Sequence, residues 1–156
     1  MRIAIACDHA GFPIKAPVLK AVVNAGHEPL DLGTFSTDSV DYPDYAMKLA
    51  STIKNGEADR GILLCGSGVG ASIVANKFPG VYAAVCHDPY SAHQGVEHDS
   101  MNVLCLGGKI IGPDLALELV PIFLKARFIG NEIGEERHLR RVSKTRKIEE
   151  NIRLNK

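Results

Sequence analysis

Short apolar runs alternate with longer amphipathic stretches along the chain. The five apolar runs are rich in the aliphatic and β-branched residues that favour strands. They cover residues 3–6, 28–32, 61–65, 82–86 and 103–106. Strands that alternate with helices are typical of βαβ units, and such units predict a parallel sheet.

The stretches between these runs show helical spacing. In residues 15–25 the apolar positions recur every three or four residues, and Gly26 follows as a C-terminal stop. Residues 44–55 repeat the pattern before Gly56. The same argument predicts helices over residues 71–77, 89–98, 113–128 and about 135–152. Helices between all strands would cover the sheet on both faces.

The predicted fold is therefore a three-layer α/β/α sandwich: a doubly wound, five-stranded parallel sheet of the Rossmann-like kind, with a C-terminal helical arm. Four of its five strands are apolar, as strands buried on both faces are, whereas residues 28–32 also contain Glu28, Pro29 and Asp31. An eight-stranded barrel needs about 250 residues, whereas these 156 residues suit one domain over 1–156. The strand order stays open. Ligands of such sheets bind at the carboxyl ends of the strands, so we expect the catalytic and binding residues in the loops that follow the strands.

Composition and charge narrow the classes of partner. Formal net charge is zero, so nothing at the level of the whole chain favours nucleic acid or an acidic membrane surface. From Lys125 onward there are ten Lys and Arg against five Asp and Glu, so the C-terminal arm is locally basic. A basic stretch of this kind is typical of a helix face exposed to solvent. The first apolar stretch is too short for a signal peptide, and no later one approaches a membrane span. We therefore expect a cytoplasmic protein.

Cysteines and histidines give no sign of a metal site. The four cysteines lie in or at the end of apolar runs and form no Cys-x-x-Cys pair: Cys7, Cys65, Cys86 and Cys105. Buried free thiols in a reducing compartment fit this spacing better than disulfides or zinc. His93 and His98 are five residues apart and do not share a helix face, so we expect no metal between them.

A glycine loop follows the third apolar run, where residues 63–77 read LLCGSGVGASIVANK. The loop matches neither the phosphate loop of nucleotide hydrolases, nor the dinucleotide fingerprint, nor the G-x-S-x-G elbow. A thiol phosphatase would need an arginine six residues after Cys65, where Ala71 stands. A phosphocysteine carrier of the sugar-transport type remains an alternative, although its cysteine usually follows the first strand.

The loop nevertheless predicts an anion site. The amides of Gly66, Gly68 and Gly70 open a helix, and N–H groups at the positive end of a helix dipole stabilise negative charge. The same field should lower the pKa of Cys65 so that its thiolate forms near neutral pH. A thiolate beside an anion hole suits proton abstraction next to a carbonyl, with the amides holding an enediolate oxygen. The alternative for Cys65 alone is an inert buried thiol.

Several separated motifs occur together in this chain: CDHAG at 7–11, VDYP at 40–43, CGSGVG at 65–70, ANK at 75–77 and RHLRRV at 137–142. With these motifs the chain resembles the type B ribose-5-phosphate isomerases and the wider group that includes the galactose-6-phosphate isomerase subunits. The resemblance runs from about Arg2 to about Ile148.

The resemblance implies an aldose–ketose isomerase without metal or organic cofactor. Its substrate would be a phosphorylated sugar, with ribose 5-phosphate and ribulose 5-phosphate first, and the reaction would pass through an enediolate. The alternatives are isomerases of galactose-, allose- or tetrose-phosphates, and a non-catalytic sugar-phosphate-binding protein. Members are usually homodimers, some tetramers, whose active sites are completed by the neighbouring subunit.

Catalytic roles follow by analogy with the family. Cys65 would be the base that moves a proton between C1 and C2, and Ala71 stands where members without this cysteine place a glutamate. Ser67 would shuttle protons between the enediol oxygens. His98 would open the furanose ring, and Asp8 would orient the sugar oxygens.

The remaining implied residues bind substrate. Tyr42 would line the pocket, while His9, Arg137 and Arg141 would hold the phosphate, the two arginines reaching it from the partner subunit on the helix at about 135–152. Positions i and i+4 share a helix face, so both guanidinium groups can hold one phosphate. Lys109 stands where many relatives have an arginine, and keeps the charge without the planar fork.

Each of these residues has a structural alternative. Asp8 and His9 would cap the following turn, Tyr42 would pack before its proline, and His98 would be a surface histidine at a helix end. The other histidines are structural by default: His27, His87, His93 and His138.

Two departures from the family pattern touch the substrate pocket. Asp99 stands where the family usually has an asparagine that donates to the enediolate, and a carboxylate there opposes catalysis unless it is protonated or turned away. Residues 129–136, IGNEIGEE, are also a few residues longer than the usual approach to the Arg-x-x-x-Arg helix. Both departures are compatible with a sugar-phosphate isomerase, but they weaken the assignment of ribose 5-phosphate as its natural substrate.

Overall fold

The structure is a computed structural model that describes residues 1–154. Its strands are β1 (Arg2–Cys7), β2 (Glu28–Asp31), β3 (Arg60–Cys65), β4 (Ala83–Val85) and β5 (Val103–Gly107). Its α-helices are α1 (Lys15–Asn24), α2 (Tyr42–Lys54), α3 (Val69–Ala75), α4 (Pro89–Asp99), α5 (Pro113–Lys125) and α6 (Glu136–Leu154), and a short 3-10 helix covers Phe12–Ile14.

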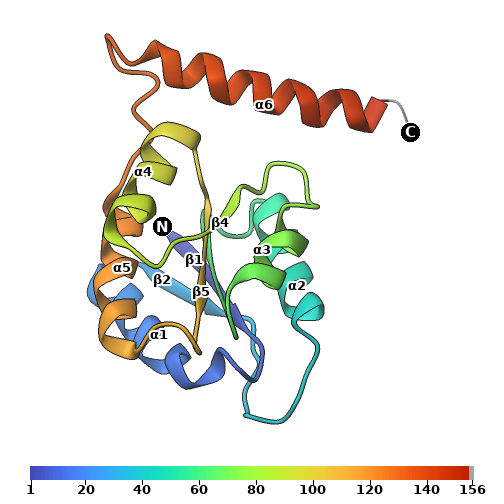
Figure 1. Cartoon of the computed structure of the whole chain (residues 1–156), viewed down its shortest axis with the longest axis vertical. Coiled ribbons are helices and arrows are strands. Elements are labelled where there is room, and N and C mark those ends of the chain that lie inside the picture. Colours follow the sequence, from blue (N-terminus) through green and yellow to red (C-terminus); the bar gives the residue numbers. More distant parts are fainter. Residues whose placement is uncertain (155–156) are drawn as a thin grey trace.

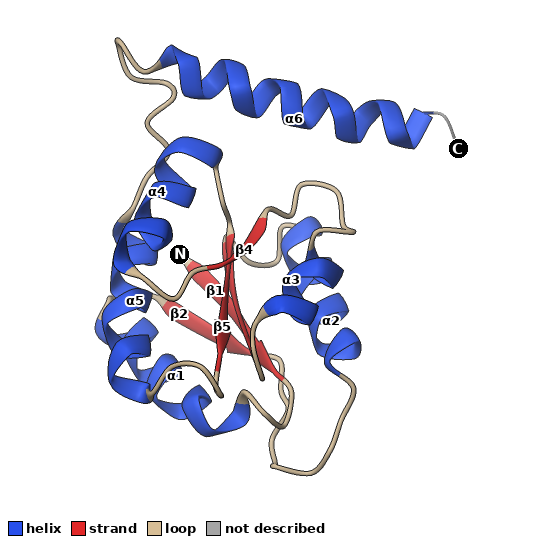
Figure 2. Ribbon diagram, in the orientation of Figure 1, coloured by secondary structure: helices blue, strands red, loops and turns tan. Residues whose placement is uncertain are grey.

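The five strands form one parallel sheet in the order β2-β1-β3-β5-β4. Helices α1, α4 and α5 cover one face, and α2 and α3 cover the other (Figures 1 and 2). Alternate residues of β1 point into the two layers: Ile3 and Ile5 belong to the core under α1 and α5, whereas Ala4 and Ala6 belong to the core under α2 and α3. The predicted three-layer α/β fold is confirmed.

Helix α6 lies apart from these layers. It crosses beyond the end of α4, in red at the top of Figure 1, and α4 is the element that it contacts most. Its N-terminal part is anchored by the buried residues His138 and Val142. Further along, the Glu149 carboxylate accepts a hydrogen bond of 2.9 Å from the N–H of Gly80. The predicted C-terminal helical arm is therefore present.

The chain leaves β1 toward β2 on one side of the sheet and reaches β3 on the other, so the switch point lies between β1 and β3. The ends of three central strands meet there, because Cys7 pairs with Leu64 and Cys65 pairs with Gly107. Ligands of open parallel sheets bind at this point, outside the carboxyl ends of the strands. The sequence left the strand order open, and the structure places Cys65 beside the switch point.

Some predicted boundaries differ from the structure. Helix α5 ends at Lys125 and not at residue 128, because Ala126 has an extended ψ of 144°. The Arg60 side chain donates hydrogen bonds to the carbonyls of Leu124 and Ala126, which takes up acceptors freed at the helix end. Helix α2 begins at Tyr42, two residues before the predicted start, since Pro43 suits the first turn of a helix.

Candidate active site

The loops after β1, β3 and β5 are joined by backbone hydrogen bonds. The N–H of Asp8 donates to Leu64 over 3.1 Å, and the N–H of Gly108 donates to Cys65 over 2.7 Å. Gly11 allows this contact, because a Cβ added there would lie 2.3 Å from the Leu64 carbonyl. At Gly108 a Cβ would lie 2.6 Å from the Ala10 oxygen. Three loops distant in sequence therefore form one rigid floor.

Cys65 ends β3 with its side chain largely inside the protein. It is 5% exposed and belongs to the apolar core under α2 and α3. Its Sγ is not in a purely apolar setting, however, because the N–H of Gly68 points to it at 3.0 Å. Gly68 has φ of 84° and is the N-cap of α3, so the glycine loop turns an amide of the helix start onto the sulfur. The sulfur therefore has one hydrogen-bond donor although the rest of the side chain lies in the apolar core.

The other three cysteines are buried and unpaired, as predicted. Burial raises the pKa of Cys7 to about 11 and that of Cys86 to about 11. Burial also raises the pKa of Cys105, which lies wholly in the core. These three residues are therefore thiols at neutral pH and serve as packing groups.

Ser67 and Tyr42 lie at the mouth of the glycine loop. Ser67 is exposed, and its Oγ accepts a hydrogen bond of 3.3 Å from the N–H of Val69. The Tyr42 ring lies against Gly70, where an added Cβ would come within 2.8 Å of the ring carbons. Tyr42 is still 42% exposed, so it both packs on the loop and presents a free ring edge to solvent.

Asp8 and His9 are held on the same side of the sheet. One oxygen of the buried Asp8 accepts the N–H groups of Ala10 and Gly11 at 2.8 and 2.9 Å, so this carboxylate does cap the following turn. The His9 Nδ1 lies 3.2 Å from both the N–H and the carbonyl of Val40. This contact fixes the imidazole through Nδ1 and leaves Nε2 for a ligand.

Lys109 completes this first group of residues. Its N–H donates to the carbonyl of Gly66 over 3.0 Å, and its aliphatic stem lies beside Gly66. The ammonium end is exposed. The structure thus brings together Asp8, His9, Tyr42, Cys65, Ser67, Gly66, Gly68, Gly70 and Lys109 at the carboxyl edge of the sheet.

His98 and Asp99 lie at the other edge of the sheet. Helix α4 starts after β4 and runs back toward the amino end of β5, and its 11 residues span about 16 Å. His98 stacks on His138 of α6, with ring centroids 4.0 Å apart. The Gln94 amide is 3.0 Å from the His98 Nδ1 and donates to Asp99 over 3.1 Å.

The two arginines of α6 lie with this second group. Arg137 pairs with Glu135 at 2.8 Å and donates to the Gly134 carbonyl. Arg141 lines a cavity of about 440 Å³ between α4, β4 and α6, together with Gln94 and Asp99. In one chain, therefore, Cys65 is separated from His98, Asp99, Arg137 and Arg141 by the height of the sheet (Figure 1).

Sequence reasoning missed the residues that hold His98 in place. His138, which the sequence predicts to be structural, is 3% exposed and lies flat against the His98 ring, a contact that the sequence does not show. Burial, and then His98 and Arg137, lower the pKa of His138, while Glu135 opposes them. Gln94 could have been found from its i, i+4 spacing to His98 on a predicted helix.

The remaining histidines have local partners. His87 accepts the N–H of Gly107 at 3.0 Å, and burial lowers its pKa. His93 pairs with Glu97 at 2.8 Å along α4. Within residues 1–154 no group of three or more metal-ligating side chains gathers at one point. In the same part of the chain, every helix is too short or too polar to span a bilayer.

Comparison with known proteins connects this geometry to a family. The family model described as Ribose/Galactose Isomerase matches residues 3–145. The chain is 43% identical to ribose-5-phosphate isomerase B of Escherichia coli, over 96% of this chain and 97% of that protein. It is 41% identical to D-erythrulose-4-phosphate isomerase of Pectobacterium atrosepticum, over 83% of this chain and 86% of that protein.

Solved structures agree with the sequence comparison. The ribose-5-phosphate isomerase B of Clostridium thermocellum superposes with a TM-score of 0.91 and 45% identity, covering 97% of this chain and 99% of that one. The match extends over the sheet, its helices and the loops described above. The chain therefore belongs to the ribose/galactose isomerase family of enzymes.

Proposed function

We propose that this protein interconverts ribose 5-phosphate and ribulose 5-phosphate through an enediolate. The observation that carries the proposal is the Cys65 sulfur, which lies at the switch point of the sheet and receives the N–H of Gly68 at 3.0 Å. The relatives named as ribose-5-phosphate isomerase B support this choice of sugar. The four unpaired thiols suit a reducing compartment, so we expect the reaction to take place in the cytoplasm.

In the proposed reaction the Cys65 thiolate removes the proton from C2 of the open-chain aldose. The electron pair forms the C1–C2 double bond, and the carbonyl oxygen at C1 becomes the enediolate oxygen. The Ser67 hydroxyl moves a proton between the oxygens on C1 and C2, and Cys65 returns its proton to C1. Amides of the glycine loop stabilise the negative charge that develops in between.

The two groups of residues are complementary but lie at opposite edges of one chain. Cys65, Asp8 and His9 would meet the sugar and one side of its phosphate. Ring opening by His98 and phosphate binding by Arg137 and Arg141 then require a second copy of the chain, arranged about a two-fold axis. Each dimer would contain two complete sites.

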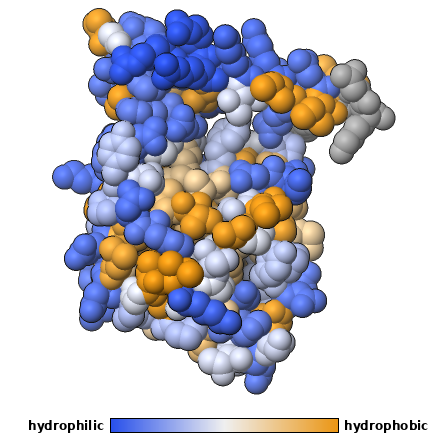
Figure 3. All heavy atoms as spheres, in the orientation of Figure 1, coloured by the Kyte–Doolittle hydropathy of each residue, from blue (hydrophilic) through white to orange (hydrophobic). Residues whose placement is uncertain are grey.

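Helix α6 offers a surface for that second copy. Its C-terminal half exposes Ile148, Ile152 and Leu154, and Figure 3 shows apolar side chains near that end of an otherwise polar helix. The first part of α6 is buried against its own chain at His138 and Val142, whereas Ile148 and Ile152 further along are more than half exposed. A partner that covers the apolar end would also fix the arginines in place.

A second candidate is the isomerisation of another aldose phosphate. Asp99 favours it, because Gln94 holds this carboxylate beside His98, where the family usually has an asparagine. The relatives named for ribose and tetrose sugars are 43% and 41% identical to this chain, so identity does not separate the two. The third possibility is a non-catalytic protein that binds sugar phosphates through the same phosphate-binding residues but does not isomerise them.

A panel of aldose phosphates in deuterated water separates these candidates. We expect ribose 5-phosphate to give the highest kcat/KM among ribose, tetrose, allose and galactose phosphates, with deuterium entering the product at the carbon that receives the proton. A higher kcat/KM for another sugar would replace the substrate and keep the chemistry. Binding of the whole panel without isomerisation or deuterium uptake would leave only the sugar-phosphate-binding protein.

A further inference from the structure

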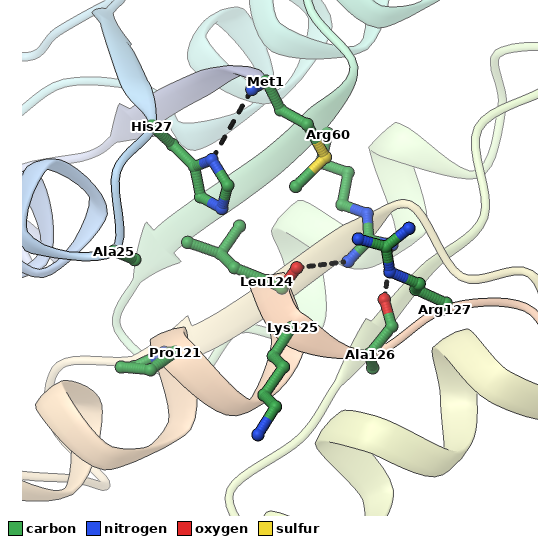
Figure 4. Close-up of a pocket in the computed structure, with 9 residues that line it drawn as sticks. All are labelled: Met1, Ala25, His27, Arg60, Pro121, Leu124, Lys125, Ala126 and Arg127. Atoms are coloured by element: carbon green, nitrogen blue, oxygen red, sulfur yellow. Dashed lines mark hydrogen bonds between the residues drawn. The ribbon is translucent and has the colours of Figure 1, made fainter.

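A second cavity opens at the amino ends of the strands, on the edge of the sheet opposite Cys65. Its volume is about 750 Å³, within the range of about 300–1,000 Å³ that is usual for small-molecule sites. Figure 4 shows Ala25 and His27, from the connection between α1 and β2, on one side of it. Leu124 and Arg127, from the end of α5 and the segment after it, lie on the other side. None of these residues belongs to the proposed active site.

The fixed charges that line this cavity are all positive. Arg60, Lys125 and Arg127 contribute cationic side chains, and no Asp or Glu is among the lining residues. Within residues 1–154, neither Lys125 nor Arg127 has a carboxylate oxygen within 4.0 Å. A concave site with uncompensated charge of one sign attracts small ions of the other sign.

Arg60 supplies a fixed point at the floor of the cavity. Its guanidinium donates to the carbonyls of Leu124 and Ala126, so its orientation is set before any ligand arrives (Figure 4). Burial, and then the charge of Arg127, lower the pKa of Arg60, while Asp59 acts in the opposite direction. The effect of Arg127 on the pKa of Arg60 arises because the two positive charges lie close together.

His27 reports on the same field. Burial lowers the pKa of His27 first, followed by the Met1 amino group and Arg60, and Asp59 again opposes them. The imidazole Nδ1 lies 3.5 Å from the Met1 nitrogen, as the dashed line in Figure 4 marks. An anion in the cavity would reverse the effect of the cations on this imidazole, which makes His27 a natural probe.

The rest of the lining is apolar. Ala25, Pro121 and Leu124 form a hydrophobic wall beside the basic side chains. We propose that this cavity binds a small phosphate monoester, with the phosphate on Arg60, Lys125 and Arg127 and an apolar substituent on Leu124 and Pro121. Three cations suit a phosphate dianion better than a single carboxylate, and the exposed Arg127 guanidinium can bind two phosphate oxygens at once. Arg60 contributes mainly its charge, because its terminal nitrogens already donate to the carbonyls of Phe123, Leu124 and Ala126. This ligand site is separate from the substrate pocket, and its residues take no part in the proposed reaction.

Phenyl phosphate is the probe for this proposal, because it combines a phosphate with an apolar ring and offers no sugar to isomerise. It is titrated into the full chain while the His27 imidazole resonances are followed by NMR, with inorganic phosphate as a second probe. We expect a saturable shift of those resonances, an upward shift of the His27 pKa, and tighter binding of phenyl phosphate than of inorganic phosphate.

Variants locate the site. The double variant with Lys125→Gln and Arg127→Gln should bind phenyl phosphate at least about tenfold more weakly, since it loses charge-assisted contacts. Both side chains are exposed, so the fold should not suffer. Lys20→Gln on α1, which removes a charge elsewhere, should bind as the unchanged chain does. The double variant should also keep its kcat/KM for ribose 5-phosphate.

Two results would overturn the proposal. The first is an unaltered His27 signal while phenyl phosphate inhibits isomerisation, which would place the probe in the substrate pocket alone. The second is equal binding by the double variant and the unchanged chain. Neither result bears on Cys65, so the proposed reaction would be judged separately.

Discussion

The N–H of Gly68 points at the Sγ of Cys65 from 3.0 Å, across the first turn of the glycine loop. Within residues 1–154 the other three thiols have no comparable backbone donor: Cys7 itself donates to the Thr34 carbonyl, Cys86 lies against Met101, and Cys105 is fully buried in the core. The N–H of Gly68 therefore distinguishes Cys65, the proposed base, from the other three buried cysteines.

Removing this thiol should abolish most of the activity. Cys65→Ala is expected to lower kcat by about 10²–10⁴-fold, the usual contribution of a positioned base, while KM changes little because alanine leaves the phosphate contacts intact. Steady-state kinetics with ribose 5-phosphate measure both constants. Cys105→Ala is the matched control, since it removes a fully buried thiol from the same core cluster as Cys65. Similar losses in both variants would show that packing, not catalysis, was damaged.

The close contact between the first two loops should be sensitive to a single methyl group. Gly11→Ala places a Cβ 2.3 Å from the Leu64 carbonyl, a backbone group that cannot rotate away. Overpacking of this kind costs about 1–3 kcal/mol or more, measured as a loss of unfolding free energy in urea. Gly112→Ala is the control, because nothing lies within 4 Å of its Cβ position and its φ of −81° suits alanine. Equal losses in the two variants would mean that the loop contact is slack.

Sharing of the site between subunits can be tested by mixing two inactive variants. A heterodimer of Cys65→Ala with Arg141→Gln carries both changes in one site and neither in the other. Random assortment of equal amounts should therefore restore about a quarter of the full activity if the two-fold arrangement holds. Each variant alone, refolded in the same way, provides the baseline. Activity that stays at this baseline after subunit exchange would place Cys65 and Arg141 in the same chain's site.

The His98–His138 stack should make the protein less stable in acid. Burial and neighbouring cations lower the pKa of His138, so the unfolded chain binds this proton more readily than the folded chain. The contribution of His138 to the unfolding free energy is then present above the ordinary histidine pKa and is lost as pH falls below it. His138→Phe keeps an aromatic ring under His98 and should flatten this part of the pH profile of unfolding. An unaltered pH profile of unfolding in His138→Phe would rule out His138 as the origin of the loss in acid.

The sequence was sufficient for the sheet and for half of the site. The apolar runs of β1, β3 and β5 are continuous, and two of the helices stop just before Gly26 and Gly56, so local pattern alone predicts these strands and their following loops. Asp8, Cys65 and Lys109 come together because parallel strands deliver their carboxyl ends to one edge. His98 ends the helix predicted over residues 89–98, and a helix that connects parallel strands runs back toward their amino ends. The predicted fold therefore already implies that His98 lies at the opposite edge, although motif order alone does not show it.

Other features depend on contacts that no local pattern encodes. The end of α5 at Lys125 follows from Arg60, which is more than sixty positions earlier in the chain and bonds to the freed carbonyls. The burial of His138 depends on the turn of residues 129–136, whose Ile129 bonds to the Glu97 carbonyl on α4. A residue that packs on a distant helix through such a turn shows no hydrophobic periodicity in the sequence. The contact of His138 with His98 therefore could not be predicted from the local pattern.

Asp99 provides the most direct test of the choice of sugar. Its carboxylate accepts the Gln94 amide at 3.1 Å, and the same amide lies 3.0 Å from the His98 Nδ1, so Asp99 and His98 are fixed beside each other. If the partner's copy of this pair faces the enediolate, a negative charge there raises the energy of the transition state, and Asp99→Asn should raise kcat/KM for ribose 5-phosphate about three- to tenfold. Glu97→Gln is the matched control, because it removes a carboxylate of the same helix that faces His93 instead. A gain in both variants would point to the general field of α4. A loss in Asp99→Asn alone, together with a gain on a different aldose phosphate, would show that the carboxylate recognises a sugar hydroxyl, and ribose 5-phosphate would then give way to that sugar as the substrate.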